Sequence, residues 1–225
     1  MSAGRLSEAD MTDISDRLEA CYTGVVHDVM RAMGLRDFTL PAELRPILPE
    51  RALAGPAFTI EGIVVPGIDA HETLLAWTGL LSKAPAGSIW VSQPNDRVVA
   101  HMGELSAETL KNKGVRGCVA DGYIRDVNFL LAIGFQTWCR GFTPRDIVGH
   151  WLPKATQVPI TIGDTVIESG DYLVGDRDGL IRVPKALVQN VVEAAEGAMN
   201  TESLIRKAIL QGIDPQQAYL KYGKF

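Results

Sequence analysis

The chain has 225 residues, of which 46% are hydrophobic and 22% charged, and its formal net charge is −5. This composition is typical of a globular protein with a buried core. Acidic and basic residues are interspersed and no Lys/Arg run occurs, which argues against a nucleic-acid-binding surface. No apolar stretch approaches the roughly 20 residues that cross a bilayer, and the polar N-terminus shows no signal peptide. We therefore expect a cytoplasmic protein that contacts neither nucleic acid nor membrane.

The N-terminal quarter predicts helices followed by a connection. Residues 7–32 have a helical pattern with a break near Thr23 and Gly24, and residues 36–50 form a proline-containing loop. The apolar, β-rich run 57–65 predicts a buried strand, and residues 71–81 predict a helix. Three widely spaced cysteines, Cys21, Cys118 and Cys139, include no CxxC pair and are expected to be reduced and mostly buried.

The middle of the chain has the most regular pattern. Strands are predicted at 87–92, 117–121 and 137–140, and helices at about 104–113 and 126–133. Gly114 and Gly134 follow these two helices, at the position where glycine commonly ends a helix. Alternating strands and helices at this spacing predict parallel strands joined by helical crossovers.

After Pro144 the pattern changes to short strands within 158–183, separated by turn signals at 162–164, 169–171 and 177–179, which indicates a β-meander. Two helices, 185–199 and 201–211, are predicted with a break near Asn200. The fold class is thus α/β, and residues 1–225 are expected to form one domain. Its parts are an N-terminal helical segment (1–50), a core (51–184) and C-terminal helices (185–225).

Two loops leave predicted parallel strands at their carboxyl ends, where functional groups of such sheets gather. The first leads to a helix start at Gly103, Glu104, Leu105 and Ser106, where free backbone N–H groups would bind a carboxylate. The second carries Arg125 and Asp126. Arg125 offers a planar fork for a carboxylate or carbonyl oxygen, and Asp126 is a hard oxygen ligand suited to Mg²⁺ or Mn²⁺.

Simpler interpretations of these residues exist. Arg-Asp occurs three times in the chain, Asp126 suits the N-cap of its own helix, and Glu104 suits the positive end of a helix dipole. The four histidines lack metal-ligand spacing, so each is interpreted as structural. Residues 176–179 are interpreted as a hairpin turn, and no nucleotide-binding glycine motif follows a strand.

The segments 95–105 and 117–126 together resemble the RraA-like family, and the resemblance continues through residues 163–184. This family includes the class II 4-hydroxy-4-methyl-2-oxoglutarate/4-carboxy-4-hydroxy-2-oxoadipate aldolases and the regulator of ribonuclease E activity. Its aldolases have an acidic residue, twenty intervening residues and then Arg-Asp, which Glu104 and Arg125-Asp126 match. Aspartate is the more usual first residue, so Glu104 departs from the pattern.

The resemblance implies an α/β sandwich of the swivelling-domain kind, assembled as homotrimers or homohexamers with sites between subunits. It also implies that a glutamate near the C-terminus of a neighbouring subunit completes the site. Glu202 is the candidate, with Glu193 and Glu196 as alternatives.

The implied reaction is cleavage of a 4-hydroxy-2-oxo acid, or decarboxylation of oxaloacetate, through a pyruvate enolate. A divalent ion on Asp126 and the charge of Arg125 would stabilise the enolate oxygen. The amides of Gly103–Ser106 would hold the C1 carboxylate, and Glu104 or Glu202 would orient a water that acts as base. The alternative is a non-catalytic protein that binds and inhibits a ribonuclease; a methyltransferase is disfavoured because no glycine-rich loop follows the first strand.

Overall fold

The structure is a computed structural model that describes residues 8–223, so residues 1–7 of the predicted N-terminal segment and residues 224–225 lie outside the described part. Its helices are α1 (Glu8–Glu19), α2 (Thr23–Ala32), α3 (Ala70–Lys83), α4 (Glu104–Asn112), α5 (Val127–Ile133), α6 (Val188–Leu210) and α7 (Pro215–Tyr222). Its strands are β1 (Arg45–Pro46), β2 (Leu53–Val64), β3 (Ile89–Gln93), β4 (Gly117–Ala120), β5 (Tyr123–Ile124), β6 (Thr137–Cys139), β7 (Gly141–Phe142), β8 (Trp151–Thr156), β9 (Ile160–Ile162), β10 (Thr165–Ile167), β11 (Tyr172–Gly175) and β12 (Leu180–Val183).

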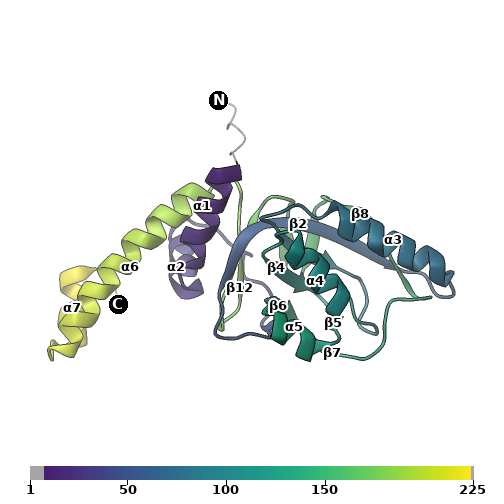
Figure 1. Ribbon diagram of the computed structural model, residues 1–225. Helices are drawn as coiled ribbons and strands as arrows, with labels where there is room; N and C mark the ends of the chain where they lie inside the picture. The colour runs from purple at the N-terminus through teal and green to yellow at the C-terminus, as the bar shows by residue number, and fades with distance from the viewer. Residues whose placement is uncertain (1–7, 224–225) are drawn as a thin grey trace.

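The main sheet is mixed and has the order β1-β6-β4-β3-β2-β11-β12, with β8 pairing to β2 as well. Its centre, β6-β4-β3-β2, is parallel, which confirms the parallel crossovers expected from the sequence. The long strand β2 pairs first with β11 and further along with β3 and β8. The sheet curls as it follows β2 (Figure 1).

Both faces of the central strands are covered, which explains their continuous apolar sequence. Alternation along β3 directs Trp90 toward a core shared with α3, α4 and α5, and Ile89 and Val91 toward a second core with β9 and β10. A third core joins α1, α2 and the first half of α6 to β11 and β12. In Figure 1, α3, α4 and α5 lie on one side of the sheet and α1, α2 and α6 lie beyond its β12 edge.

The strands predicted as one β-meander form two separate hairpins. β9 and β10 make a two-stranded sheet of their own, whereas β11 and β12 join the main sheet and are linked by the predicted turn at 176–179. Strand β8 was not predicted, since its pairing depends on a distant partner. There the ring of Trp151 packs on Gly62, where a Cβ atom would lie 2.1 Å from the ring.

The predicted break near Asn200 is wrong, because α6 continues from Val188 to Leu210. An asparagine inside a helix lowers helix stability by less than about 1 kcal/mol relative to alanine. The Thr201 hydroxyl donates to the Gly197 carbonyl (3.2 Å) inside the helix and does not cap a new helix. The far half of α6 and α7 extend away from the sheet (Figure 1). Leu204, Leu210 and Leu220 on this arm are 54%, 81% and 74% exposed, so a large apolar surface has no cover within the described chain.

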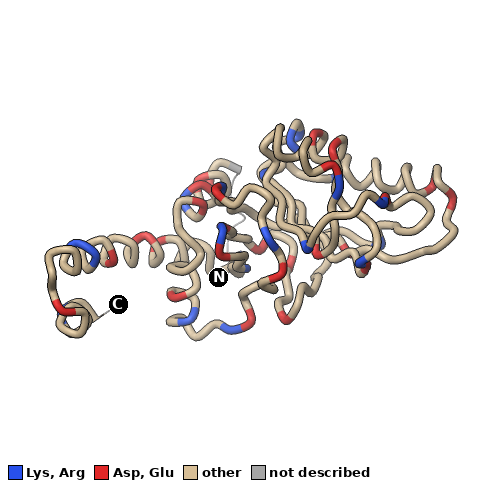
Figure 2. Tube along the Cα trace, turned by 90° about the horizontal axis from the view of Figure 1, so that it is seen from below, with Lys and Arg blue, Asp and Glu red and all other residues tan. Residues whose placement is uncertain are grey.

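Acidic and basic residues are interspersed along the described chain (Figure 2). None of the helices within residues 8–223 combines the length and apolarity that a membrane span requires.

Candidate active site

The loops after β3 and β4 run side by side, because their parent strands are parallel neighbours. The His101 N–H donates to the Tyr123 carbonyl (2.8 Å), and the Arg125 N–H donates to the Met102 carbonyl (2.9 Å). These bonds place Gly103, the N-cap of α4, beside Arg125 and Asp126. The structure thus brings together the helix start and the Arg-Asp pair that the sequence singled out.

Asp126 occupies the N-cap position of α5 with φ 56° and ψ 35°, a left-handed conformation that is uncommon outside glycine. The structure thus places Asp126 at the N-cap as the sequence suggested, but its side chain makes no capping bond to α5. Instead its Oδ2 accepts a hydrogen bond from the Glu104 N–H, in the first turn of α4 (3.2 Å). One carboxylate therefore links the two functional loops.

Gly103 is required for this close approach. A Cβ atom at Gly103 would lie 2.7 Å from Asp126 Oδ2 and 3.2 Å from Arg125 Cγ. Its φ of −153° is ordinary extended backbone, so the requirement is one of space and not of conformation. The glycine thus admits the side chains of Arg125 and Asp126 to the start of α4.

The predicted anion site keeps three of its four amides. The Glu104 N–H is taken by Asp126, but the N–H groups of Gly103, Leu105 and Ser106 find no acceptor within residues 8–223. The Ser106 hydroxyl accepts from Trp77 Nε1 of α3 (2.9 Å), which fixes the first turn of α4 against its neighbour. Free amides at a helix N-terminus bind anions well.

Arg125 lies between two carboxylates. Its Nε is 3.4 Å from Asp126 Oδ2, and its Nη1 is 3.4 Å from Asp146 Oδ2. Asp146 could not be selected from the three Arg-Asp dipeptides by local sequence, because its approach to Arg125 depends on how the loop after β7 packs. All three side chains are between one third and one half exposed, so the group is open to solvent and ligands.

These residues line a cavity with a volume of about 410 Å³. The lining includes the charged side chains Glu104, Arg125, Asp126 and Asp146. It also includes apolar side chains, those of Leu74, Trp77, Leu81, Met102, Ile147 and Val148. A concave apolar site with a few convergent polar groups is the usual form of a small-molecule site.

Asp126 is the candidate metal ligand in this cavity. Within residues 8–223, no three His, Cys, Asp or Glu side chains are grouped to hold a metal. Asp126 Oδ1, however, accepts no hydrogen bond from the described residues, and the side chain is 35% exposed at the cavity. One carboxylate oxygen with several waters fits Mg²⁺, which keeps part of its hydration shell.

Residues 12–182 match the family model described as RraA-like, Aldolase/RraA. The chain belongs to the RraA-like family. The match includes both functional loops and Asp146, but not α6 and α7, which carry Glu202.

Similar proteins support the assignment along the whole chain. A Halalkalibacterium halodurans protein, whose name proposes it as a 4-hydroxy-4-methyl-2-oxoglutarate aldolase, is 27% identical over 96% of this chain and 97% of its own length. An uncharacterised protein from Pseudomonas syringae has a TM-score of 0.84 at 26% identity, covering 99% of this chain and 98% of that one. Streptomyces coelicolor RraAS2, described as an unusual member of the RNase ES inhibitor RraA family, shares the fold (TM-score 0.77, 24% identity, 91% and 99% covered).

In this RraA-like chain, a buried aspartate, Asp96, links two loops that contribute residues to the cavity. Asp96 accepts hydrogen bonds from the N–H groups of Val98 and Val99 (both 2.9 Å) and from Nε2 of His101 and His150 (both 3.0 Å). Burial raises the pKa of Asp96, but these four bonds outweigh it and hold that pKa well below its ordinary value. Asp96 thereby joins the loop before α4 to the loop that carries Asp146.

His101 is the buried member of this network. Burial lowers the pKa of His101 to about 4, against the opposing effect of Asp96. The ring is therefore neutral near pH 7, and because a carboxylate only accepts, its proton sits on Nε2. Nδ1 is buried without a partner among the described residues. This histidine is structural, in agreement with the interpretation made from the sequence.

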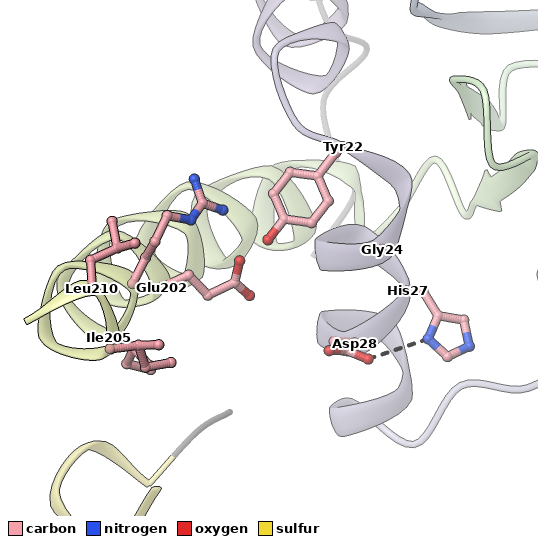
Figure 3. Close-up of a pocket in the computed structure, with 9 residues that line it drawn as sticks. Tyr22, Gly24, His27, Asp28, Glu202, Ile205 and Leu210 are labelled. Carbon is pink, nitrogen blue, oxygen red and sulfur yellow. Dashed lines mark hydrogen bonds and ion pairs between the residues drawn. The ribbon is translucent and has the colours of Figure 1, made fainter. Parts of the chain in front are cut away.

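Glu202 does not reach the Arg125 cavity of its own chain. It lines a different cavity of about 520 Å³ between α2 and α6, where its side chain points into the space beside Tyr22 and Asp28 (Figure 3). Of the two alternatives, Glu193 accepts a hydrogen bond from Gln189 and Glu196 binds Arg17 through both oxygens (2.8 Å each). None of these three glutamates therefore lines the Arg125 cavity of its own chain.

Neither a cysteine nor a lysine is among the described residues that line the Arg125 cavity. Cys21, Cys118 and Cys139 are buried and unpaired, as predicted, and burial raises the pKa of Cys139 to about 11. No lysine lines the cavity: Lys111 donates to the Ile133 carbonyl and Lys113 to the Ser82 carbonyl (3.2 Å).

The low pKa of His101 predicts a loss of stability between pH 6.5 and 5. In this window the unfolded chain, with an ordinary histidine pKa near 6.5, takes up a proton that the folded chain does not. The wild type should lose about 2 kcal/mol more than His101→Gln over this range, a difference of about 5 °C in Tm. Glutamine keeps the donor to Asp96 and cannot titrate.

Thermal melts of both proteins at pH 8, 6.5 and 5 measure this difference. The pH 8 melts, where neither state is protonated at this position, provide the reference. Parallel Tm curves for the two proteins would show that His101 is not held neutral.

Proposed function

We propose that this chain is a divalent-metal-dependent carbon–carbon lyase that releases pyruvate from a 2-oxo acid. The observation that carries the proposal is the Asp126 carboxylate, which faces a cavity between the Arg125 guanidinium and the first turn of α4. The relative named as an aldolase, which matches over almost its full length, supports the same reaction class.

The chain's own groups suit a pyruvyl unit. The C1 carboxylate of the substrate would bind the N–H groups of Leu105 and Ser106 at the start of α4. The adjacent 2-oxo group would then face Arg125, whose charge stabilises the negative oxygen of the pyruvate enolate. Cleavage of a 4-hydroxy-2-oxo acid such as 4-hydroxy-4-methyl-2-oxoglutarate and decarboxylation of oxaloacetate both form this enolate.

Asp126 would hold Mg²⁺ or Mn²⁺ through its open Oδ1. When bound, the ion supplies Lewis-acid stabilisation at the 2-oxo oxygen. Glu104, whose side chain lines the cavity, would orient a water that removes the 4-hydroxyl proton of an aldol substrate. A Schiff-base mechanism is disfavoured, because it needs a lysine in the wall, and none of the described lining residues is one.

We also propose that the site is completed in a homo-oligomer, a trimer or a hexamer, in which Glu202 of a neighbouring subunit approaches Arg125. Two features support this: the exposed apolar surface of the α6–α7 arm, and the position of Glu202 away from the cavity of its own chain. The competing function, inhibition of a ribonuclease by binding, would need neither the cavity nor its carboxylates.

Metal removal should abolish pyruvate release. EDTA-treated protein should release no pyruvate from oxaloacetate or 4-hydroxy-4-methyl-2-oxoglutarate, and Mg²⁺ or Mn²⁺ should restore the activity, because enolate formation depends on the cation at Asp126. A coupled lactate dehydrogenase assay measures pyruvate. Full activity in EDTA would exclude a metal role, and absence of activity under all metals would favour the ribonuclease-binding function.

Arg125→Lys should lower kcat/KM on the order of 10²–10³-fold, because lysine keeps the charge but loses the planar fork. Arg145→Lys is the matched control, since Arg145 belongs to a neighbouring Arg-Asp dipeptide and does not line the cavity. A change below about threefold at Arg125 would assign it a structural role.

Subunit mixing tests the shared site. Arg125→Lys and Glu202→Gln should each be nearly inactive alone. Mixed oligomers of the two variants should regain about one quarter of wild-type activity, because at about one interface in four an intact Arg125 of one subunit meets an intact Glu202 of its neighbour. Co-expression with two affinity tags isolates the mixed species. An active monomer by light scattering, or no recovery in mixed oligomers, would contradict the shared site.

A further inference from the structure

The segment 146–149, which follows β7 and precedes β8, contributes its first three residues to the cavity lining. The loop before α4 holds this segment at both ends. At its start, the Ala100 N–H donates to the Arg145 carbonyl (2.9 Å). At its end, Nε2 of His150 donates to Asp96 Oδ1 (3.0 Å). One wall of the cavity is therefore fixed by contacts that lie outside the cavity.

Asp96 divides its hydrogen bonds between the two loops. Its side chain is 3% exposed, and a buried carboxylate is costly unless its oxygens are hydrogen-bonded. Oδ2 accepts from three groups of its own loop, the N–H groups of Val98 and Val99 and the His101 ring. Oδ1 accepts from His150 of the other loop. One oxygen thus orders the loop before α4, and the other holds the segment 146–149 against it.

The segment's own contact with the charged site is weak. Asp146 Oδ2 lies 3.4 Å from Arg125 Nη1, and these side chains are 48% and 38% exposed. Ion pairs as exposed as this contribute little by themselves to the order of a loop. Arg125 Nε lies 3.4 Å from Asp126 Oδ2, so two nitrogens of the guanidinium face carboxylates of different loops. The direction of the planar fork therefore depends on where the segment 146–149 is held.

We propose that His150 is a positioning residue for the site: its bond to Asp96 keeps Asp146 against Arg125 and so aligns the guanidinium with the 2-oxo oxygen of the substrate. The identity of that oxygen rests on the proposed function. His150 and Asp96 act without touching the ligand, since neither is among the described residues that line the cavity.

Substitutions at His150 test this role. His150→Ala removes the donor to Asp96, whereas the side-chain amide of His150→Gln retains one. With Mg²⁺ present, His150→Ala should lower kcat for pyruvate release about tenfold and leave KM within about twofold, because a misplaced group weakens binding of the transition state. His150→Gln should keep kcat within about threefold of wild type. The control is His71→Ala, which removes an exposed histidine outside the cavity and should change neither constant.

Two further variants keep the test independent of folding and of other routes to the site. His150→Phe retains a ring without a donor and should behave like His150→Ala. In a double-mutant cycle, His150→Ala should add no further loss to Arg125→Lys, because its effect passes through Arg125. Additive losses would overturn the proposal. So would a kcat of His150→Ala within about twofold of wild type, or a His150→Gln enzyme as slow as His150→Ala.

Oxalate binding separates this proposal from the lyase function. Oxalate mimics the pyruvate enolate, so its affinity follows the alignment of Arg125 whether or not a substrate is turned over. Calorimetric titrations with Mg²⁺ should show about tenfold weaker binding to His150→Ala and near wild-type binding to His150→Gln. If this pattern appears and no pyruvate is released, the lyase function is wrong and the positioning role stands. Equal oxalate affinity in all His150 variants would overturn the positioning role alone. If the wild type neither binds oxalate nor releases pyruvate, both are wrong.

Discussion

The hydrogen bond from the Glu104 N–H to Asp126 Oδ2 is the contact on which the site depends. It joins the start of α4 to the loop after β4, two segments that meet because β3 and β4 are parallel neighbours. Gly103 has no side chain to obstruct it, and Asp126 adopts a left-handed backbone conformation to make it. A conformation of this kind costs of order 1–3 kcal/mol and persists where surrounding structure enforces it, which is common at functional sites.

The remaining parts of the site are arranged around this contact. Trp77 fixes Ser106 from the side of α3, and Asp96 holds the loop that leads to α4 against the loop of Asp146. The result is a cavity lined by both charged and apolar side chains. Because electrostatic groups act best when they are fixed before the reaction, this buried support explains why polar residues such as Asp96 and His101 occupy the interior.

Local sequence signals were sufficient for most of the central fold. Glycines at 114 and 134 marked the helix ends, and both have positive φ (78° and 64°) as helix-ending glycines do. The meeting of Arg125 and Asp126 with the start of α4 could be predicted, because both loops follow neighbouring parallel strands at their carboxyl ends. Asp146 and β8 were not found, since their roles arise from pairing with segments far away in the chain. The unbroken α6 shows the converse: a locally unfavourable Asn200 did not end a helix whose first half packs on α1 and α2.

We propose that the start of α4, Arg125 and Asp126 bind one ligand together. A crystal structure of the protein with Mg²⁺ and oxalate, a planar mimic of the pyruvate enolate, tests it most directly. We expect oxalate on the N–H groups of Leu105 and Ser106, with its far oxygens facing Arg125 and a cation on Asp126 Oδ1. Oxalate bound elsewhere, with these amides still unliganded and Asp126 still bonded only to Glu104 and Arg125, would contradict the claim.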